Sequence, residues 1–223
     1  MRQPQSLQWR DGDVPVSTRF DDPYFSLENG LAETRHVFLA GNDLTARFDG
    51  PLHVAELGFG TGLNFLTCVE AWQRQGAAQP LHFTSFEGFP ITPEDMARAL
   101  AAFPELGDLA PGLLAVWSPE GGTWAPFPGV TLTVIIGDAR ETLPAWKGRA
   151  DAWFLDGFSP AKNPELWQPE LMAEVARHTA QGGSAATYTA AGFVRRGLAD
   201  AGFTVERTPG YGRKRHMTKA TLS

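Results

Sequence analysis

The chain has 223 residues, of which 43% are hydrophobic and 20% charged, and a formal net charge of −6. These proportions are typical of a soluble globular protein with one large domain, or one domain with a small extension. No apolar run approaches the ~18 residues that a membrane span needs, and the N-terminal residues lack the apolar core of a secretory signal. The single cysteine, Cys68, excludes an intramolecular disulfide, so we expect a cytoplasmic protein.

Charge is unevenly distributed along the chain. Residues 195–223 contain seven Lys or Arg and two Asp or Glu, so this segment carries +5 and residues 1–194 carry −11. A basic C-terminal face on an acidic body can bind a polyanion. A solvated surface with scattered arginines explains the same charges equally well.

Candidate strands and helices alternate after residue 50, which predicts an α/β fold with a mostly parallel sheet. Residues 1–50 predict a small β-rich flank or lid, and residues 51–223 the main domain, with an insertion near 104–130 that contains a short hairpin. The expected strands are 52–57, 81–86, 131–136, 151–155, 183–188, 203–207 and 215–221, and the expected helices lie near 62–75, 92–102, 139–146, 166–180 and 191–201. The connection 208–214 is too short for a parallel crossover, so we expect an antiparallel last strand.

Local signals support several of these boundaries. Thr92 is a good helix N-cap, because Pro93 follows at the first helical position and Asp95 three residues after the cap. The pair Gly182 and Gly183, and Gly202, predict helix ends before strands.

A glycine-rich turn follows the first strand of the main domain. Glu56 is followed by Gly58, Gly60 and Gly62, and glycines let the backbone approach a ligand closely. A dinucleotide site requires G-x-G-x-x-G/A, but its third small position is Leu63 here. The G-x-G-x-G spacing after an acid instead resembles the first motif of class I S-adenosylmethionine methyltransferases. The resemblance implies that Glu56 attracts the methionine ammonium, directly or through water.

Two further acids follow predicted strands. Glu87 ends the second strand, where a carboxylate can accept both hydrogen bonds of a ribose diol. Asp138 follows the third strand, and the resemblance places it beside the adenine. Each acid alone is more often a helix cap or a surface group, but three acids in order at three strand ends favour a cofactor site.

The fourth strand ends at Asp156, within the segment DAWFLDGFSPAKNPELW at 151–167. Ligands of open α/β sheets bind beyond the carboxyl ends of the strands. An acid beside the aromatic Phe158, in a loop that Pro160 stiffens, therefore predicts a site for a planar, polar group. Capping of the following turn is the simpler reading of Asp156, and we rank it second.

Longer motifs extend the resemblance over nearly the whole chain. They are FDDPYFSLENGLAETRHVFLAGN at 20–42, ELGFGTGLNFLT at 56–67, HFTSFEGFPIT at 82–92, WFLDGFSPAKNPELW at 153–167, AAGFVRRGLADAGF at 190–203 and GYGRKRHM at 210–217. The chain resembles the methyltransferase domain of the bifunctional MnmC family, which acts in the biosynthesis of 5-methylaminomethyl-2-thiouridine in tRNA. The bifunctional form continues into a flavin-dependent oxidoreductase domain, for which this chain has no matching residues. We expect either a free-standing methyltransferase or a fragment.

The resemblance implies a Rossmann-like class I methyltransferase fold, with a mostly parallel seven-stranded sheet, an antiparallel last strand and helices on both faces. Its cofactor is S-adenosylmethionine, and its acceptor is the 5-aminomethyl amine of the wobble uridine in the tRNA anticodon loop. A separate flavin-dependent oxidase is a candidate partner, and no metal is expected. The implied cofactor residues are Glu56, Gly58, Gly60, Gly62, Asn64, Glu87, Gly88, Asp138 and Ala139. The candidate substrate residues are Phe158, Pro160, Lys162, Asn163, Tyr188, Arg195, Arg196, Arg213 and Lys214.

The chemistry of an amine acceptor assigns Asp156 its role. A primary amine is mostly protonated at neutral pH, and only the neutral form has a lone pair for methylation. We expect Asp156 to orient the amine N–H first, and to accept its proton second, because a nearby carboxylate also favours the ammonium. Methylation of a small molecule or a protein, and a non-catalytic tRNA-binding module, remain open alternatives.

Overall fold

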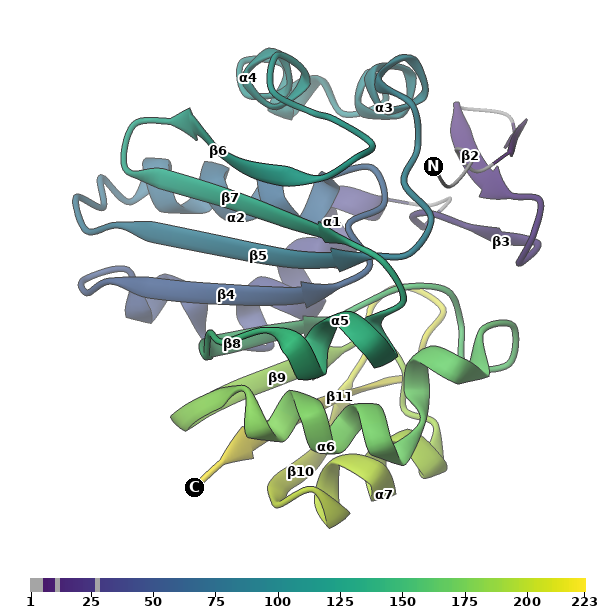
Figure 1. The fold of residues 1–223 in the computed structure, drawn as a ribbon, viewed down its shortest axis with the longest axis vertical. Coiled ribbons are helices and arrows are strands. Elements are labelled where there is room, and N and C mark those ends of the chain that lie inside the picture. The colour runs from purple at the N-terminus through teal and green to yellow at the C-terminus, as the bar shows by residue number, and fades with distance from the viewer. Residues whose placement is uncertain (1–5, 11–12, 27–28) are drawn as a thin grey trace.

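The computed structural model describes residues 6–10, 13–26 and 29–223. Its described residues form a central eight-stranded sheet in the order β10-β11-β9-β8-β4-β5-β7-β6 (Figure 1). The strands are β4 (Leu52–Leu57), β5 (Leu81–Glu87), β6 (Gly122–Phe127), β7 (Val130–Ile136), β8 (Ala150–Leu155), β9 (Thr179–Thr187), β10 (Phe203–Pro209) and β11 (His216–Leu222). The five strands from β9 to β7 are parallel, whereas β6, β10 and β11 pair antiparallel with their neighbours.

This arrangement confirms the predicted fold class and the antiparallel last strand. All seven expected strands are present, and the hairpin expected in the insertion adds β6 to the edge of the sheet as an eighth. Gly129 has a positive φ of 77° in the tight turn between β6 and β7, a conformation that glycine adopts without steric cost.

Helices cover both faces of the sheet (Figure 1). The helices are α1 (Gly30–Thr34), α2 (Leu63–Arg74), α3 (Pro93–Leu100), α4 (Ala110–Leu114), α5 (Ala139–Ala145), α6 (Pro169–Arg177) and α7 (Gly192–Asp200), with a π-helix at Arg35–Ala40 and short 3-10 turns at Leu44–Arg47, Pro104–Leu106 and Pro164–Trp167. Alternate strand residues enter two separate cores, because successive side chains of a strand point to opposite faces. Phe154 packs with α2 in one core, and its neighbour Trp153 packs with α5, α6 and α7 in the other.

Two of the boundary predictions have different outcomes. Thr92 caps α3 as expected, because its hydroxyl accepts a hydrogen bond from the Asp95 N–H at 3.1 Å. The helix expected at 166–180 is shorter, since α6 ends at Arg177, and Gly182 and Gly183 lie inside β9 rather than at a helix end.

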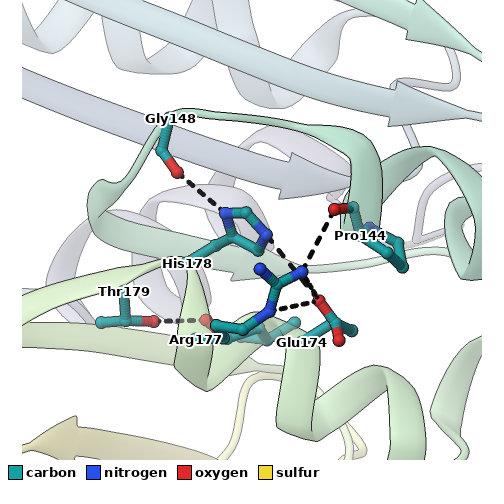
Figure 2. Close-up of polar contacts among 7 residues, drawn as sticks. Pro144, Gly148, Glu174, Arg177, His178 and Thr179 are labelled. Carbon is teal, nitrogen blue, oxygen red and sulfur yellow. Dashed lines mark hydrogen bonds and ion pairs between the residues drawn. The ribbon is translucent and has the colours of Figure 1, made fainter.

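Side chains at the end of α6 explain the early stop (Figure 2). His178 Nδ1 lies 2.8 Å from the Gly148 carbonyl oxygen, and the Thr179 hydroxyl donates to the Val175 carbonyl at 2.7 Å. The Arg177 guanidinium donates to the Pro144 carbonyl and pairs with Glu174. The Thr179 contact satisfies a carbonyl at the end of α6, and the contacts with Pro144 and Gly148 tie this helix end to α5 and to the loop before β8.

The N-terminal region has two parts. The strands β1 (Leu7–Arg10), β2 (Val14–Ser17) and β3 (Asp22–Pro23) form a small antiparallel sheet. Residues 30–40 and 44–47 are helical, and Leu31, Phe38 and Leu44 pack into the same core as α2. The separation of residues 1–50 as a flank or lid stays a prediction.

Candidate functional site

The register of the parallel strands brings three loops to one level. Leu57 at the end of β4 pairs with Phe86 in β5 and with Leu155 in β8. The next residues, Gly58, Glu87 and Asp156, therefore emerge side by side at the carboxyl edge of the sheet. A cavity of about 760 Å³ opens there, and Gly58, Glu87 and Asp156 all line it.

The glycine loop is shaped for close approach. Gly58, Gly60 and Gly62 have φ values of 87°, 54° and 77°, which residues other than glycine rarely adopt. A Cβ atom on Gly60 would lie 3.1 Å from the Tyr24 ring, and one on Gly58 3.2 Å from the Gly157 Cα. Gly58 and Gly60 line the cavity, whereas Gly62 is not among its lining residues and instead caps α2.

Glu87 connects the first two loops. Its side chain is 6% exposed, and its Oε2 accepts a hydrogen bond from the Gly60 N–H at 2.8 Å while its Oε1 accepts from the Phe89 N–H. Burial raises the pKa of this carboxyl, and the backbone hydrogen bonds oppose that shift. Gly88 lines the cavity beside it.

Asp138 is the N-cap residue of α5 and lines the cavity together with Ala139. Its side chain accepts from the Arg140 N–H at 2.9 Å, which caps the helix, and it pairs with the Arg140 guanidinium at 2.6 Å. Asp138 is thus both a helix cap and a wall of the cavity, so the two sequence-based interpretations of this acid are compatible.

Asn64 joins two carboxylates at the first turn of α2. Its amide Nδ2 donates to Asp156 Oδ2 at 2.6 Å and to Glu56 Oε1 at 2.9 Å. Its Oδ1 accepts from the Thr34 hydroxyl at 2.8 Å, and the Ser85 hydroxyl donates to Glu56 Oε2 at 2.7 Å. The Thr34 contact fixes the orientation of the amide, so both N–H groups face carboxylates.

Burial sets the charge properties of this pair. It raises the pKa of Asp156 to about 6, against the hydrogen bond from Asn64, and it raises the pKa of Glu56 well above its usual value. Glu56 is fully buried and is not among the cavity-lining residues, so it reaches the cavity through Asn64. Its contact with a methionine ammonium stays a prediction.

An aromatic cluster covers the turn after Asp156. Phe158 stacks on Phe20 with ring centres 4.6 Å apart, and Tyr24 meets it edge-on at 5.1 Å. The Ser159 N–H donates to Asp22 Oδ2 at 2.8 Å. Phe20, Asp22 and Tyr24 line the cavity and are site residues that the sequence-based prediction missed. Their aromatic and acidic composition was visible, but contacts across more than 130 residues are not encoded in spacing.

The remaining predicted substrate residues divide into two groups. Lys162 and Asn163 line the cavity, and Lys162 pairs with Asp21 at 2.9 Å. Arg213 and Lys214, in the loop between β10 and β11, and Tyr188, after β9, also line it. Pro160, Arg195 and Arg196 are not among its lining residues.

Lys214 makes two contacts inside the cavity. Its Nζ lies 2.8 Å from Glu33 Oε1 and 4.1 Å from the centre of the Tyr188 ring. The Tyr188 hydroxyl donates to the Gly157 carbonyl at 2.8 Å. Glu33, which also lines the cavity, is a fourth site residue that the sequence-based prediction missed.

Two kinds of feature are absent from the described residues. Among them, no group of three or more His, Cys, Asp or Glu residues is arranged to hold a metal ion. No helix in the same residues has the length and apolar character needed to cross a membrane.

Curated relatives resemble this chain along most of its length. It is 50% identical to the "tRNA 5-methylaminomethyl-2-thiouridine biosynthesis bifunctional protein MnmC" of Stutzerimonas stutzeri and 51% identical to the protein of the same name from Chromobacterium violaceum. Each match covers 97% of this chain and 34% of the relative. The chain therefore spans about a third of the length of these relatives.

Solved structures agree on the fold. MnmC2 from Aquifex aeolicus matches with a TM-score of 0.78 and 24% identity, over 100% of this chain and 72% of that one. Spermidine synthase from Thermotoga maritima matches with a TM-score of 0.57 and 12% identity, over 98% of this chain and 72% of that one. Residues 111–223 match a family model described as S-adenosyl-L-methionine-dependent methyltransferase. The chain belongs to this family of S-adenosyl-L-methionine-dependent methyltransferases.

Proposed function

We propose that this chain transfers a methyl group from S-adenosylmethionine to the 5-aminomethyl amine of the wobble uridine, or 2-thiouridine, in tRNA. The product is the 5-methylaminomethyl nucleoside. The observation that carries the proposal is the Asp156 carboxylate, which lines the cavity one strand away from the glycine loop. The names of the curated relatives support tRNA as the substrate.

The residues of the cavity fit the cofactor of the family. The positive φ angles of Gly58 and Gly60 would let the backbone of the loop approach the cofactor closely. Glu87 still has acceptor capacity for a ribose diol, because each carboxylate oxygen can accept two hydrogen bonds. Asp138 follows the next strand, β7, and lines the same cavity, where it would lie beside the adenine. When bound, S-adenosylmethionine supplies an electrophilic methyl group.

Asp156 would prepare the acceptor amine. An alkylammonium has no lone pair for attack, so it must lose a proton before or during transfer. A carboxylate with a pKa raised to about 6 by burial can orient the N–H groups and is a better proton acceptor than an ordinary aspartate. The proton released from the amine would pass to Asp156 and then to solvent.

Aromatic residues and cations would hold the rest of the acceptor. A wobble base lies in a single-stranded loop and can be splayed out onto aromatic rings, and Phe158 and Tyr188 offer such rings in the cavity wall. Arg213 and Lys214 are exposed at the cavity edge, where their side chains would contact phosphates of the tRNA backbone. A cytoplasmic location and a flavin-dependent oxidase that prepares the aminomethyl precursor are further parts of this proposal.

Transfer of a labelled methyl group tests the function. The purified chain should label tRNA that carries 5-aminomethyluridine and leave tRNA with an unmodified wobble uridine unlabelled. Labelling of small amines or proteins in preference to both tRNAs would instead support the small-molecule or protein alternative.

A further inference from the structure

The cavity beside Asp156 contains an alkylammonium group that the protein itself supplies. Lys214 Nζ contacts the Glu33 carboxylate at 2.8 Å and lies 4.1 Å from the centre of the Tyr188 ring. All three side chains belong to the cavity lining. We propose that Glu33 and Tyr188 form an ammonium subsite for the acceptor amine, and that Lys214 occupies this subsite until the acceptor displaces it.

The two partners of Lys214, a carboxylate and an aromatic ring, are groups that bind alkylammonium ions in proteins generally. A carboxylate supplies a charge-assisted hydrogen bond, and the face of an aromatic ring attracts a cation through its quadrupole. A lysine side chain ends in a primary alkylammonium, as does the protonated form of a 5-aminomethyl group. Lys214 is therefore a chemical mimic of the acceptor that the proposed function requires.

The subsite lies next to the candidate catalytic group. The Tyr188 hydroxyl donates to the carbonyl of Gly157, the residue after Asp156, which fixes the ring beside that turn. Lys214 and Glu33 both act on the Asp156 carboxyl electrostatically, Lys214 lowering its pKa and Glu33 raising it. An ammonium held in the subsite is thus within the electrostatic reach of Asp156.

Lys214 is more exposed than Glu33, so Lys214 is the partner that can leave the subsite. The Glu33 side chain is 13% exposed and belongs to α1, whereas that of Lys214 is 45% exposed and belongs to the loop between β10 and β11. Lys214 can leave toward a phosphate while Glu33 and Tyr188 stay in place. Partly exposed ion pairs are weak, so displacement of Lys214 costs little. A substrate with both an ammonium and a phosphate would displace Lys214 more readily than a free amine, because the phosphate gives Lys214 a new partner.

Binding of a free nucleoside tests this inference without phosphate contacts. Calorimetry would compare 5-aminomethyluridine with 5-hydroxymethyluridine, which lacks the amine, in the presence of S-adenosylhomocysteine. Glu33→Gln should weaken binding of the aminomethyl nucleoside by roughly tenfold, the loss of one charge-assisted hydrogen bond. Lys214→Gln should tighten it by roughly two- to fivefold, since a competing ion pair is removed. Binding of the hydroxymethyl nucleoside should change in neither variant.

Two controls sharpen the result. Lys219→Gln removes a lysine that pairs with Asp43 at 3.3 Å and is not among the lining residues of the cavity, so it should leave both nucleosides unaffected. In the double variant Glu33→Gln/Lys214→Gln, the gain from Lys214→Gln should be smaller than in the single variant, because Lys214 has already lost its charged partner when Glu33 is replaced. Unchanged or weaker binding of the aminomethyl nucleoside to Lys214→Gln would overturn the inference.

The inference rests on the proposed function, but the two can fail separately. If the parent chain does not methylate tRNA that carries 5-aminomethyluridine, while the preference for the aminomethyl nucleoside and its dependence on Glu33 persist, the function is wrong and the subsite stands. If that tRNA is methylated but the parent binds the two nucleosides equally, the subsite is wrong and the function stands.

Discussion

The Asn64 side-chain amide donates one N–H to the Asp156 carboxylate at 2.6 Å and the other to the Glu56 carboxylate at 2.9 Å. One amide therefore holds two acids, of which Glu56 is fully buried and Asp156 is half-buried. Glu56 is enclosed and also bonded by Ser85, whereas Asp156 lines the cavity. This arrangement makes Asn64 a positioning residue for Asp156, in addition to its implied place among the cofactor residues.

The first prediction concerns the pH dependence of activity. The Asn64 hydrogen bond lowers the pKa of Asp156 against the effect of burial, so Asn64→Ala should raise that pKa. If ionised Asp156 orients the amine, activity falls as pH drops through about 6 in the parent and at a higher pH in the variant. Profiles of kcat against pH measure the shift. The control Thr67→Val removes a buried hydroxyl from the same helix and should not move the acid limb of the profile. An Asn64→Ala profile that matches the parent would contradict the positioning role of Asn64.

The second prediction concerns stability. The pKa of Asp156 is about 6 in the folded chain against 3.8 ordinarily, so the folded state binds the proton more tightly and loses stability as pH rises between these values. Asp156→Asn removes this loss. The variant should be more stable than the parent at pH 7.5 by up to about 3 kcal/mol, with little difference at pH 3.5. Chemical denaturation at both pH values measures it, and equal differences at the two would show that ionisation of Asp156 is not the cause.

The third prediction concerns Glu87. Glu87→Ala should weaken binding of S-adenosylmethionine by roughly 1–3 kcal/mol, the range for hydrogen bonds to a charged acceptor. Part of this loss should come from the glycine loop, because the Gly60 N–H loses the carboxylate that accepts its hydrogen bond at 2.8 Å. Calorimetry measures the affinity, with Glu141→Ala on the exposed face of α5 as the control. Unchanged affinity in Glu87→Ala would remove this acid from the site.

The fourth prediction separates backbone strain from crowding. Gly60 and Gly76 both have positive φ, 54° and 65°, but a Cβ on Gly60 would lie 3.1 Å from the Tyr24 ring, whereas one on Gly76 would meet nothing within 4 Å. Both alanine variants should lose some stability. Only Gly60→Ala should also lose affinity for S-adenosylmethionine in calorimetry. An equal affinity for the two variants would show that close approach to the loop is unimportant.

The fifth prediction compares two basic pairs. Arg213 and Lys214 line the cavity, and Arg195 and Arg196 on α7 do not. Replacing either pair with glutamine should weaken tRNA binding if it meets phosphates, and should reduce the salt slope by about 0.7–0.9 for each phosphate that the protein no longer neutralises. We expect a larger reduction for Arg213 and Lys214. Slopes unchanged in both double variants would place the tRNA on another face.

Much of this fold was predictable because its signals are local. Alternating strand and helix patterns located β4, β5, β7 and β8, and the Gly58–Gly62 spacing and the acids at strand ends identified one edge of the sheet. The short connection before β11 predicted its antiparallel pairing. These features depend on neighbouring residues or on rules of sheet topology, so spacing alone was sufficient.

The remaining features depend on tertiary contacts. The helix expected to reach residue 180 ends at Arg177, because His178 bonds Gly148, which is 30 residues away in sequence. The partners of Asp156 could be guessed only in part: Asn64 lies in the glycine motif, but the contacts of Glu33 with Lys214 and of Phe20 with Phe158 join distant segments. No periodicity encodes such contacts.

The most direct test of the central claim is nucleoside mass spectrometry of tRNA that carries 5-aminomethyluridine, after incubation with saturating S-adenosylmethionine. The parent chain should convert the wobble nucleoside to its 5-methylaminomethyl form. Asp156→Asn, which keeps the size of the side chain, should lose most of the turnover while its cofactor affinity stays within a few-fold. A wobble nucleoside that the parent leaves unmethylated, or near-normal turnover by Asp156→Asn, would contradict the account.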